Sequence, residues 1–265
     1  MKKIIRKLCL PVLLVGALAG KAQTTWYFGA NAGVKFTAGV PANVTTSPMN
    51  TSEGSTVLVS ASNDVILSTD GLQIWNGSGV IQVATGVLGG NSSGTQTAMV
   101  VPVPGTTNRA FIFTTANAEQ AYGNNNLAMM GLRVSLVSFS SQTTSATVSM
   151  VETNVQLTPA NINVGEKVEV TPDGAGGYWI VTHGIGVYSA ASGGTAYNTG
   201  GESKLYLYHV TCGTTTVATL KATEKSPSFP ALTAHRSWVH NGGGTSVDWS
   251  TNNELNGHGQ LRVQQ

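Results

Sequence analysis

One pentapeptide of the chain has the spacing of a hydrolase nucleophile. Gly90-Asn91-Ser92-Ser93-Gly94 matches the Gly-x-Ser-x-Gly pattern, in which the serine sits on a strained turn between a buried strand and a helix. The segment that follows, Thr95-Gln96-Thr97-Ala98-Met99-Val100-Val101-Pro102, is rich in β-branched residues and closed by proline. Because that composition predicts a strand and not a helix, the sequence argues against Ser92 as a nucleophile.

The histidines and aspartates do not have the spacing of a known metal site. The histidines are scattered, with no His-Glu-x-x-His series: His183, His209, His235, His240 and His258. Three aspartates, Asp64, Asp70 and Asp173, stand in predicted turns, where a carboxylate accepts backbone amide hydrogen bonds. Calcium would need several oxygens converging on one loop, and no Asp-x-Asp-x-Asp series is present. We therefore expect no metal and no cofactor.

Two kinds of site are left open by these patterns. His183 ends an apolar segment and is expected at the rim of a sheet, and with Trp179 and Trp75 it forms the set of candidate ligand contacts. The alternative is a hydrolase acting on polysaccharide or peptide, which would need two carboxylates about 5 to 10 Å apart. The acids nearest the ends of predicted strands are Glu53, Asp70, Glu166 and Glu169.

The elements that must position these residues are strands. Residues 165–183 predict a β-hairpin, because Val168 and Val170 alternate with polar residues, Pro172-Asp173-Gly174 makes a turn, and Tyr178-Trp179-Ile180-Val181 forms a second, apolar arm. An apolar run of that length suits a strand covered on both faces.

Similar units recur along the chain in three sets. The first set is 56–60, 65–68, 72–76 and 80–83; the second is 96–101, 110–115, 127–139 and 147–151; the third adds 204–210 and 215–220 to the hairpin. Repetition of this kind predicts an all-β, β-propeller-like array of four-stranded antiparallel blades. The chain ends in a strand-like segment, 259–263, after the long polar stretches 189–203 and 226–257, so we expect the array to be incomplete at its C-terminus.

An aromatic segment, residues 26–36, precedes the first set. Alternation places Tyr27 on the opposite face from Trp26 and Phe28. We expect these rings in the core, and the alternative is an exposed aromatic platform for a sugar or base. If the segment closes the array against residues 259–263, deleting 23–36 would cause aggregation or unfolding, whereas deleting 191–202 would change stability little.

The N-terminus has the three parts of a signal peptide. Basic residues, among them Lys2 and Arg6, precede a short apolar stretch, 8–19, and small residues at Gly20 and Ala22 predict cleavage after Ala22. The apolar stretch is shorter than the roughly 20 residues of a membrane span. We expect residues 1–22 to be removed and residues 23–265 to form one secreted domain, without a membrane span.

Removal of the signal peptide changes the net charge and the cysteine content of the chain. Removing the five cations of the signal peptide leaves nine lysines and arginines against twelve acids, a net charge of −3. An acidic chain has no basic surface with which to neutralise phosphates, which argues against nucleic acid as a partner. Cys9 leaves with the signal peptide, so that Cys212 stays alone and cannot form an internal disulfide.

Several motifs together resemble a known bacterial family. They are Trp26-Tyr27-Phe28-Gly29, Ser52-Glu53-Gly54, the segment 70–76, Val101-Pro102-Val103-Pro104-Gly105, Glu166-Lys167, and Gly177-Tyr178-Trp179-Ile180-Val181-Thr182-His183. In this order they resemble the N-terminal propeller-like region of secreted Bacteroidota proteins described as gliding-motility-associated or type 9 secretion substrates. The resemblance implies a secreted or cell-surface protein and carries over no catalytic residue. The further blades and C-terminal sorting domain usual in that family do not follow Gly259-Gln260-Leu261-Arg262-Val263 here.

The function expected from the sequence is a non-enzymatic role in binding, adhesion or structure. Without a convergent set of acid, base and nucleophile, the long polar loops are the natural place for a site. The expected partner is an extracellular glycan or a cell-surface protein.

Overall fold

The protein was analysed as a computed structural model. The structure describes residues 24–91, 94–116, 131–158, 163–188, 197–198, 205–211, 213–217 and 220–225. Of these, the side chains of residues 163, 183–188, 197–198, 205 and 221–225 are not described. The expected signal peptide, Ser92 and the segment 259–263 lie outside the described residues.

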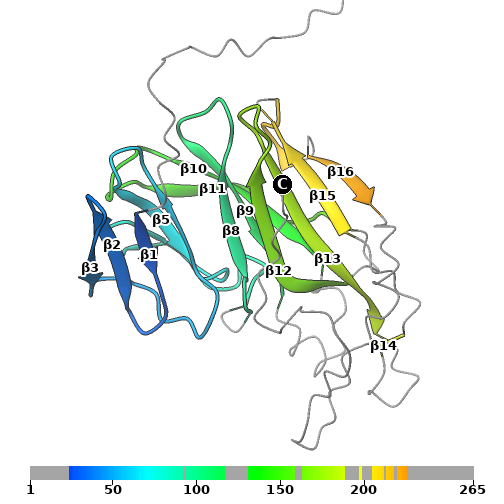
Figure 1. The fold of residues 1–265 in the computed structure, drawn as a ribbon, viewed down its shortest axis with the longest axis horizontal. Helices are drawn as coiled ribbons and strands as arrows, with labels where there is room; N and C mark the ends of the chain where they lie inside the picture. Colours follow the sequence, from blue (N-terminus) through cyan, green and yellow to red (C-terminus); the bar gives the residue numbers. More distant parts are fainter. Residues whose placement is uncertain are drawn as a thin grey trace, which may run out of the picture.

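All secondary-structure elements in the described part of the chain are β-strands, arranged in antiparallel sheets (Figure 1). The first sheet has the order β1 (Thr25–Tyr27), β2 (Gly33–Thr37), β3 (Val40–Val44). The second has the order β4 (Thr56–Val59), β5 (Val65–Thr69), β6 (Ile74–Asn76), β7 (Ile81–Val83). Both sheets are simple meanders, in which each strand pairs with the next along the chain.

The third and fourth sheets repeat the same plan with longer strands. The third contains β8 (Ala98–Pro102), β9 (Arg109–Thr114), β10 (Arg133–Phe139) and β11 (Val148–Gln156). The fourth contains β12 (Asn163–Pro172), β13 (Tyr178–Tyr188), β15 (Leu205–Val210) and β16 (Lys221–Lys225), and the short β14 (Tyr197–Asn198) pairs with the end of β13. The all-β class and the four-stranded antiparallel sheets expected from the sequence are therefore confirmed.

Asn and Asp side chains fix the tight turns between strands. Asn76 accepts hydrogen bonds from the amides of Ser78 and Val80, and Asp70 accepts from those of Leu72 and Gln73. Gly71 adopts φ +83, a left-handed conformation that glycine tolerates without steric cost. These turns hold the registers that place alternate side chains on opposite faces.

Three hydrophobic clusters lie between consecutive sheets. Tyr27 of the first sheet packs with Val57 and Trp75 of the second. Residues of the second and third sheets, including Leu67 and Ile112, form the next cluster. The third cluster joins the third and fourth sheets and includes Phe111, Phe113, Val168, Ile180 and Tyr208. The first strands β1, β4, β8 and β12 also contact one another in that order, so the sheets stack in chain order (Figure 1).

One predicted strand was misplaced and another strand was missed. The last strand of the fourth sheet is Lys221–Lys225 and not 215–220, because the chain after Thr211 forms a tight turn, in which the Thr214 amide bonds the Thr211 carbonyl. Strand β3 was not predicted, because Pro41 and Asn43 are rare in strands. It lies at a sheet edge, where the missing N–H of Pro41 is tolerated.

The aromatic segment at the start of the fold is only partly in the core. Tyr27 is buried, but Trp26 and Phe28 are 46% and 45% exposed, which corrects the expectation that all three rings pack inside. Alternation correctly predicted that Tyr27 lies on one face of the strand and that Trp26 and Phe28 lie on the other. Among the described residues, the face with Tyr27 packs against the second sheet, and the face with Trp26 and Phe28 does not. Strand β1 pairs with β2, and its pairing with residues 259–263 stays a prediction.

Candidate functional site

The outer face of the fourth sheet carries the candidate site. One face of this sheet, with Ile180, Tyr206 and Tyr208, is buried against the third sheet. Strand register puts Thr171, Trp179 and His209 in one row across the opposite face. The adjacent row contains Glu169, Val181 and Leu207. This outer face thus combines an aromatic ring, an imidazole, a hydroxyl and a carboxyl group.

Trp179 and His209 form a parallel stack on that face. Their ring centroids are 4.0 Å apart and their planes differ by 6°. Since the two residues are directly opposite each other on β13 and β15, the sheet itself sets this contact. The His209 side chain is 30% exposed, so part of the imidazole is accessible from solvent.

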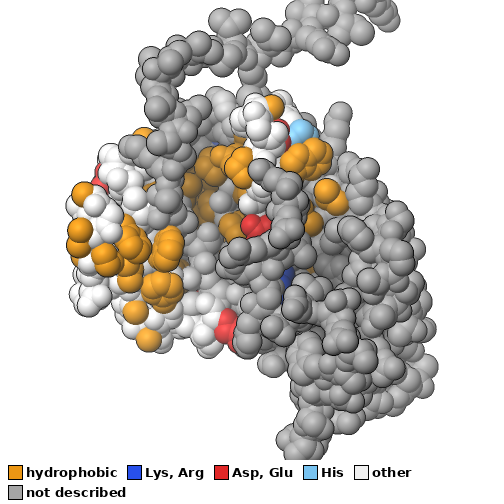
Figure 2. Space-filling model, viewed as in Figure 1, with side chains coloured by type: hydrophobic (Ala, Val, Ile, Leu, Met, Phe, Trp, Pro, Cys, Tyr) orange, Lys and Arg blue, Asp and Glu red, His pale blue; other side chains and the backbone are white. Residues whose placement is uncertain are grey.

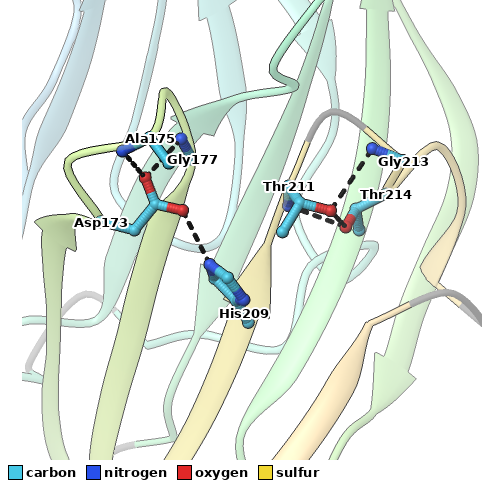
Figure 3. Close-up of polar contacts among 7 residues, drawn as sticks. All are labelled: Asp173, Ala175, Gly177, His209, Thr211, Gly213 and Thr214. Atoms are coloured by element: carbon cyan, nitrogen blue, oxygen red, sulfur yellow. Dashed lines mark hydrogen bonds and ion pairs between the residues drawn. The ribbon is translucent and has the colours of Figure 1, made fainter. Parts of the chain in front are cut away.

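Asp173, in the turn between β12 and β13, fixes the imidazole. Its Oδ2 lies 2.8 Å from His209 Nε2, and its Oδ1 accepts hydrogen bonds from the amides of Ala175 and Gly177, both 2.7 Å long (Figure 3). The Asp173 side chain is only 7% exposed. Burial by itself would raise the pKa of Asp173, but the hydrogen bonds from His209 and the two amides, with the positive charge of protonated His209, outweigh it and lower the pKa. With Nε2 held by the carboxylate, Nδ1 is the nitrogen left for a ligand.

The low pKa of Asp173 predicts a pH dependence of stability. Because its pKa is lower in the folded than in the unfolded chain, Asp173 contributes stability above its unfolded pKa, near 3.8, and this is lost as pH falls through the folded pKa. We expect Asp173→Ala to cost about 1–3 kcal/mol at pH 7, since two turn amides and the imidazole lose their acceptor. Urea unfolding at pH 7 and pH 3 measures this loss of unfolding free energy. A loss that is equal at both pH values would contradict the lowered pKa of Asp173. Asp173→Asn is the control, because it can keep the turn bonds while removing the charge.

The pKa of Glu169, on the same face, is shifted upward, in the opposite direction from that of Asp173. Burial raises the pKa of Glu169 above its usual value, and a backbone hydrogen bond from Val170 only partly offsets this effect. The charged carboxylate therefore destabilises the fold at neutral pH, so Glu169→Gln should raise the urea midpoint at pH 7 and leave it unchanged well below pH 4. A lower midpoint at pH 7 would show that the carboxylate is stabilising instead. Residues that reduce stability are often retained at functional sites.

Of the three ligand contacts predicted from the sequence, Trp75 and Trp179 lie on different sheets. Trp179 belongs to the outer face of the fourth sheet, whereas Trp75 is 6% exposed and packs between the first and second sheets. The backbone of His183 pairs with Leu205, and its side chain is outside the described residues. His209 was missed as a site residue, although its alternation with Leu207 and the Asp173-Gly174 turn were visible in the sequence.

A second polar cluster joins residues associated with three sheets: Glu53 before β4, Thr95 before β8 and Glu166 within β12. Thr95 Oγ1 lies 3.0 Å from Glu166 Oε2 and 3.4 Å from Glu53 Oε2, and the Thr95 amide also donates to Glu166 Oε2. The two carboxylate oxygens therefore cannot be further apart than these two distances together, about 6.4 Å. Of the four acids singled out in the sequence, the structure thus brings Glu53 and Glu166 together. Asp70 instead accepts hydrogen bonds from backbone amides of its own turn.

The described residues show neither a metal-binding cluster nor a membrane-spanning helix. Within the described ranges, no three His, Cys, Asp or Glu residues gather closely enough to hold a metal ion. No helix in the same part of the chain has the length and hydrophobicity that crossing a membrane requires.

Searches of protein-family models, curated proteins and solved structures each found no match to the chain.

Proposed function

We propose that this chain is a secreted or cell-surface binding protein without enzymatic activity, and that it recognises an extracellular glycan through the outer face of its fourth sheet. The observation that carries the proposal is the partly exposed Trp179–His209 stack, in which Asp173 holds the imidazole. Functional residues are usually held in place by neighbours that fix their rotamers, and Asp173 does this for the imidazole.

The chemistry of the face suits a neutral, hydroxyl-rich ligand. A sugar presents apolar C–H groups, which pack on aromatic rings, and hydroxyls, which both donate and accept hydrogen bonds. On the outer face Trp179 and Leu207 supply apolar surface, and Thr171, His209 and Glu169 supply polar groups in adjacent rows. The carboxylates Glu169 and Asp173 disfavour a phosphorylated ligand, which agrees with the acidic net charge of residues 23–265.

The arrangement of sheets supports a propeller-like array as the scaffold. Clusters between the first and second, second and third, and third and fourth sheets are what successive blades would produce. The basic and apolar residues before Ala22 support export, and the resemblance to gliding-motility-associated proteins agrees with a surface role.

Glycan binding by residues 23–265 tests the proposal. On a glycan array, we expect a specific signal that Trp179→Ala weakens at least tenfold, because the apolar half of the site and the support of His209 are removed. Trp26→Ala is the matched control and should bind as the original chain does, since Trp26 lies on the first sheet. A blank array with folded protein, or equal loss in both variants, would contradict the proposal, and binding to a cell-surface protein alone would replace the glycan as ligand.

A hydrolase acting on polysaccharide or peptide is the second candidate function. The observation that favours it is the proximity of Glu53 and Glu166, whose limit of about 6.4 Å includes the separation used by retaining glycosidases. Release of reducing sugar or peptide fragments that disappears in Glu53→Gln and Glu166→Gln, but not in Glu169→Gln, would establish it. Absence of turnover across broad polysaccharide and peptide panels would remove it.

A further inference from the structure

The stack with His209 occupies one face of the Trp179 ring and leaves the other face for further contacts. His209 lies opposite Trp179 on β15, and the two rings are parallel with centroids 4.0 Å apart. In the sheet, β13 lies between β12 and β15. Because one face of the indole is turned towards β15, the other face is turned towards β12. The residue of β12 directly opposite Trp179 is Thr171.

Strand register places Glu169 beside the second face of the Trp179 ring. Glu169 precedes Thr171 by two residues on the same side of β12, which makes it a diagonal neighbour of Trp179. Diagonal neighbours across two strands are roughly 7–8 Å apart, within reach of long side chains. Directly opposite Glu169 is Val181, a 5% exposed apolar residue. The ring face thus has a hydroxyl and a carboxyl group next to it.

The two carboxylates near Trp179 differ in how far their acceptor positions are used. Asp173 is saturated, because its Oδ1 accepts from two turn amides and its Oδ2 contacts His209. Among the described residues, the Glu169 carboxylate receives one hydrogen bond, from the amide of Val170. A carboxylate offers about four acceptor positions on its two oxygens. Glu169 is therefore the carboxylate that still has acceptor positions for a ligand.

This end of the fourth sheet is accessible from solvent. The His209 side chain is 30% exposed, and Trp179, Thr171 and Glu169 are each partly exposed. Figure 2 shows histidine atoms at the surface, next to hydrophobic and acidic atoms, over the end of the sheet at which β12 turns into β13 in Figure 1. A ligand can therefore approach the stack from outside.

We propose that Glu169 determines the specificity of the site by accepting hydrogen bonds from two adjacent hydroxyls of a sugar that lies on the β12-facing side of Trp179. The inference rests on the proposed function and narrows the ligand to neutral sugars with a free vicinal diol. A sugar packs its C–H groups on an aromatic ring, and a carboxylate accepts from two hydroxyls at once.

The same chemistry defines the sugars that the site rejects. An ionised carboxylate only accepts hydrogen bonds, so hydroxyls converted into ethers cannot bind it. A sugar with its own carboxylate or phosphate would place like charges together, which lowers affinity further. Glu169 is thus a specificity residue, whereas Asp173 positions the imidazole.

Calorimetric titration of residues 23–265 at pH 7 tests the inference. The probes are neutral disaccharides of glucose, galactose and mannose, each native and permethylated, since permethylation keeps the C–H groups and removes every hydroxyl donor. Glu169→Gln should weaken binding of the native disaccharides about tenfold, because a neutral amide replaces a charged acceptor. The same variant should have a higher urea midpoint, because a buried charge is removed. The permethylated forms should not bind.

Asp64→Asn is the matched control, because it removes one acidic charge from the turn before β5 in the second sheet. It should bind the native disaccharides as the original chain does. A similar loss of affinity in this variant would mean that overall charge, and not a contact at Glu169, decides binding.

The outcomes separate this inference from the function on which it rests. Binding that Trp179→Ala weakens but Glu169→Gln leaves unchanged would overturn the role of Glu169 and keep the glycan site. Equal binding of permethylated and native disaccharides would also overturn it. If affinity and urea midpoint both fell in Glu169→Gln, the residue would be structural. Absence of binding to the whole panel would overturn the inference, and a blank glycan array would overturn the proposed function with it.

Discussion

Replacing Phe113 with alanine is expected to lower the free energy of unfolding by about 3–5 kcal/mol, the range for large aromatic residues removed from a core. Phe113 has no exposed surface and belongs to the cluster between the third and fourth sheets. The centroid of its ring lies 6.1 Å from the centroid of the Phe111 ring. Close-packed sheets cannot collapse into the space left by a phenyl ring without breaking their strand registers, so most of the cavity should persist.

Phe28→Ala is the matched control for this substitution. The same side-chain atoms are removed from a ring that is 45% exposed, so the expected loss is about 1 kcal/mol or less. Urea unfolding at low protein concentration gives both values. Equal losses in the two variants would mean that the cluster between the third and fourth sheets is not the core that the structure describes.

Deleting residues 23–36 is expected to make the protein aggregate or unfold. The deletion removes β1 and most of β2, and with them Tyr27 from the cluster between the first and second sheets. Met49, Val57 and Trp75, all buried in the complete chain, would then face solvent, and β3 would lose the strand with which it pairs. Light scattering and a thermal melt measure the outcome. A soluble product with an unchanged melting temperature would show that the segment is a free arm.

A deletion of similar length, residues 191–202, provides the comparison. The sequence predicted a polar loop there, but the structure places β14 within it, paired with Val187 and Tyr188 at the end of β13. Since β14 has only two residues and pairs with the end of β13, the expected loss is much smaller than for residues 23–36.

Strands with clear alternation and strong turn residues could be predicted from the sequence. The second sheet is the best case: the apolar segments around Ile66 and Ile74 are separated by Asp70-Gly71 and Gly77-Ser78-Gly79, and each predicted strand is present within about two residues. The hairpin of β12 and β13 was predicted for the same reason, including the turn at Asp173.

Features that depend on neighbouring sheets could not be predicted. Alternation separates Tyr27 from Trp26, but it cannot tell which of the two faces meets another sheet. Trp75 was predicted as a ligand contact, and the sequence could not show that Tyr27 of the first sheet packs with it. Strand β3 is held by its pairing with β2 and not by its own propensity, so its composition suggested a loop.

The candidate site was only partly predictable for a related reason. Trp179, Asp173 and His209 were all noted in the sequence, but 36 residues separate Asp173 from His209. Only the register of β13 with β15 brings the imidazole against the indole and within reach of the turn. The proximity of Glu53 to Glu166 depends in the same way on Thr95, which lies between them although it is far from both in the sequence.

The most direct test of the binding proposal is the position of the ligand on the protein. The chain has five tryptophans, so a proton–nitrogen NMR spectrum of residues 23–265 should contain five indole signals, which Trp→Phe variants can assign. On titration with a glycan that binds on the array, the account predicts that the Trp179 indole signal moves and saturates, while those of the exposed Trp26 and the buried Trp75 stay in place. A shift confined to Trp26, or saturable binding that leaves Trp179 unmoved, would contradict it.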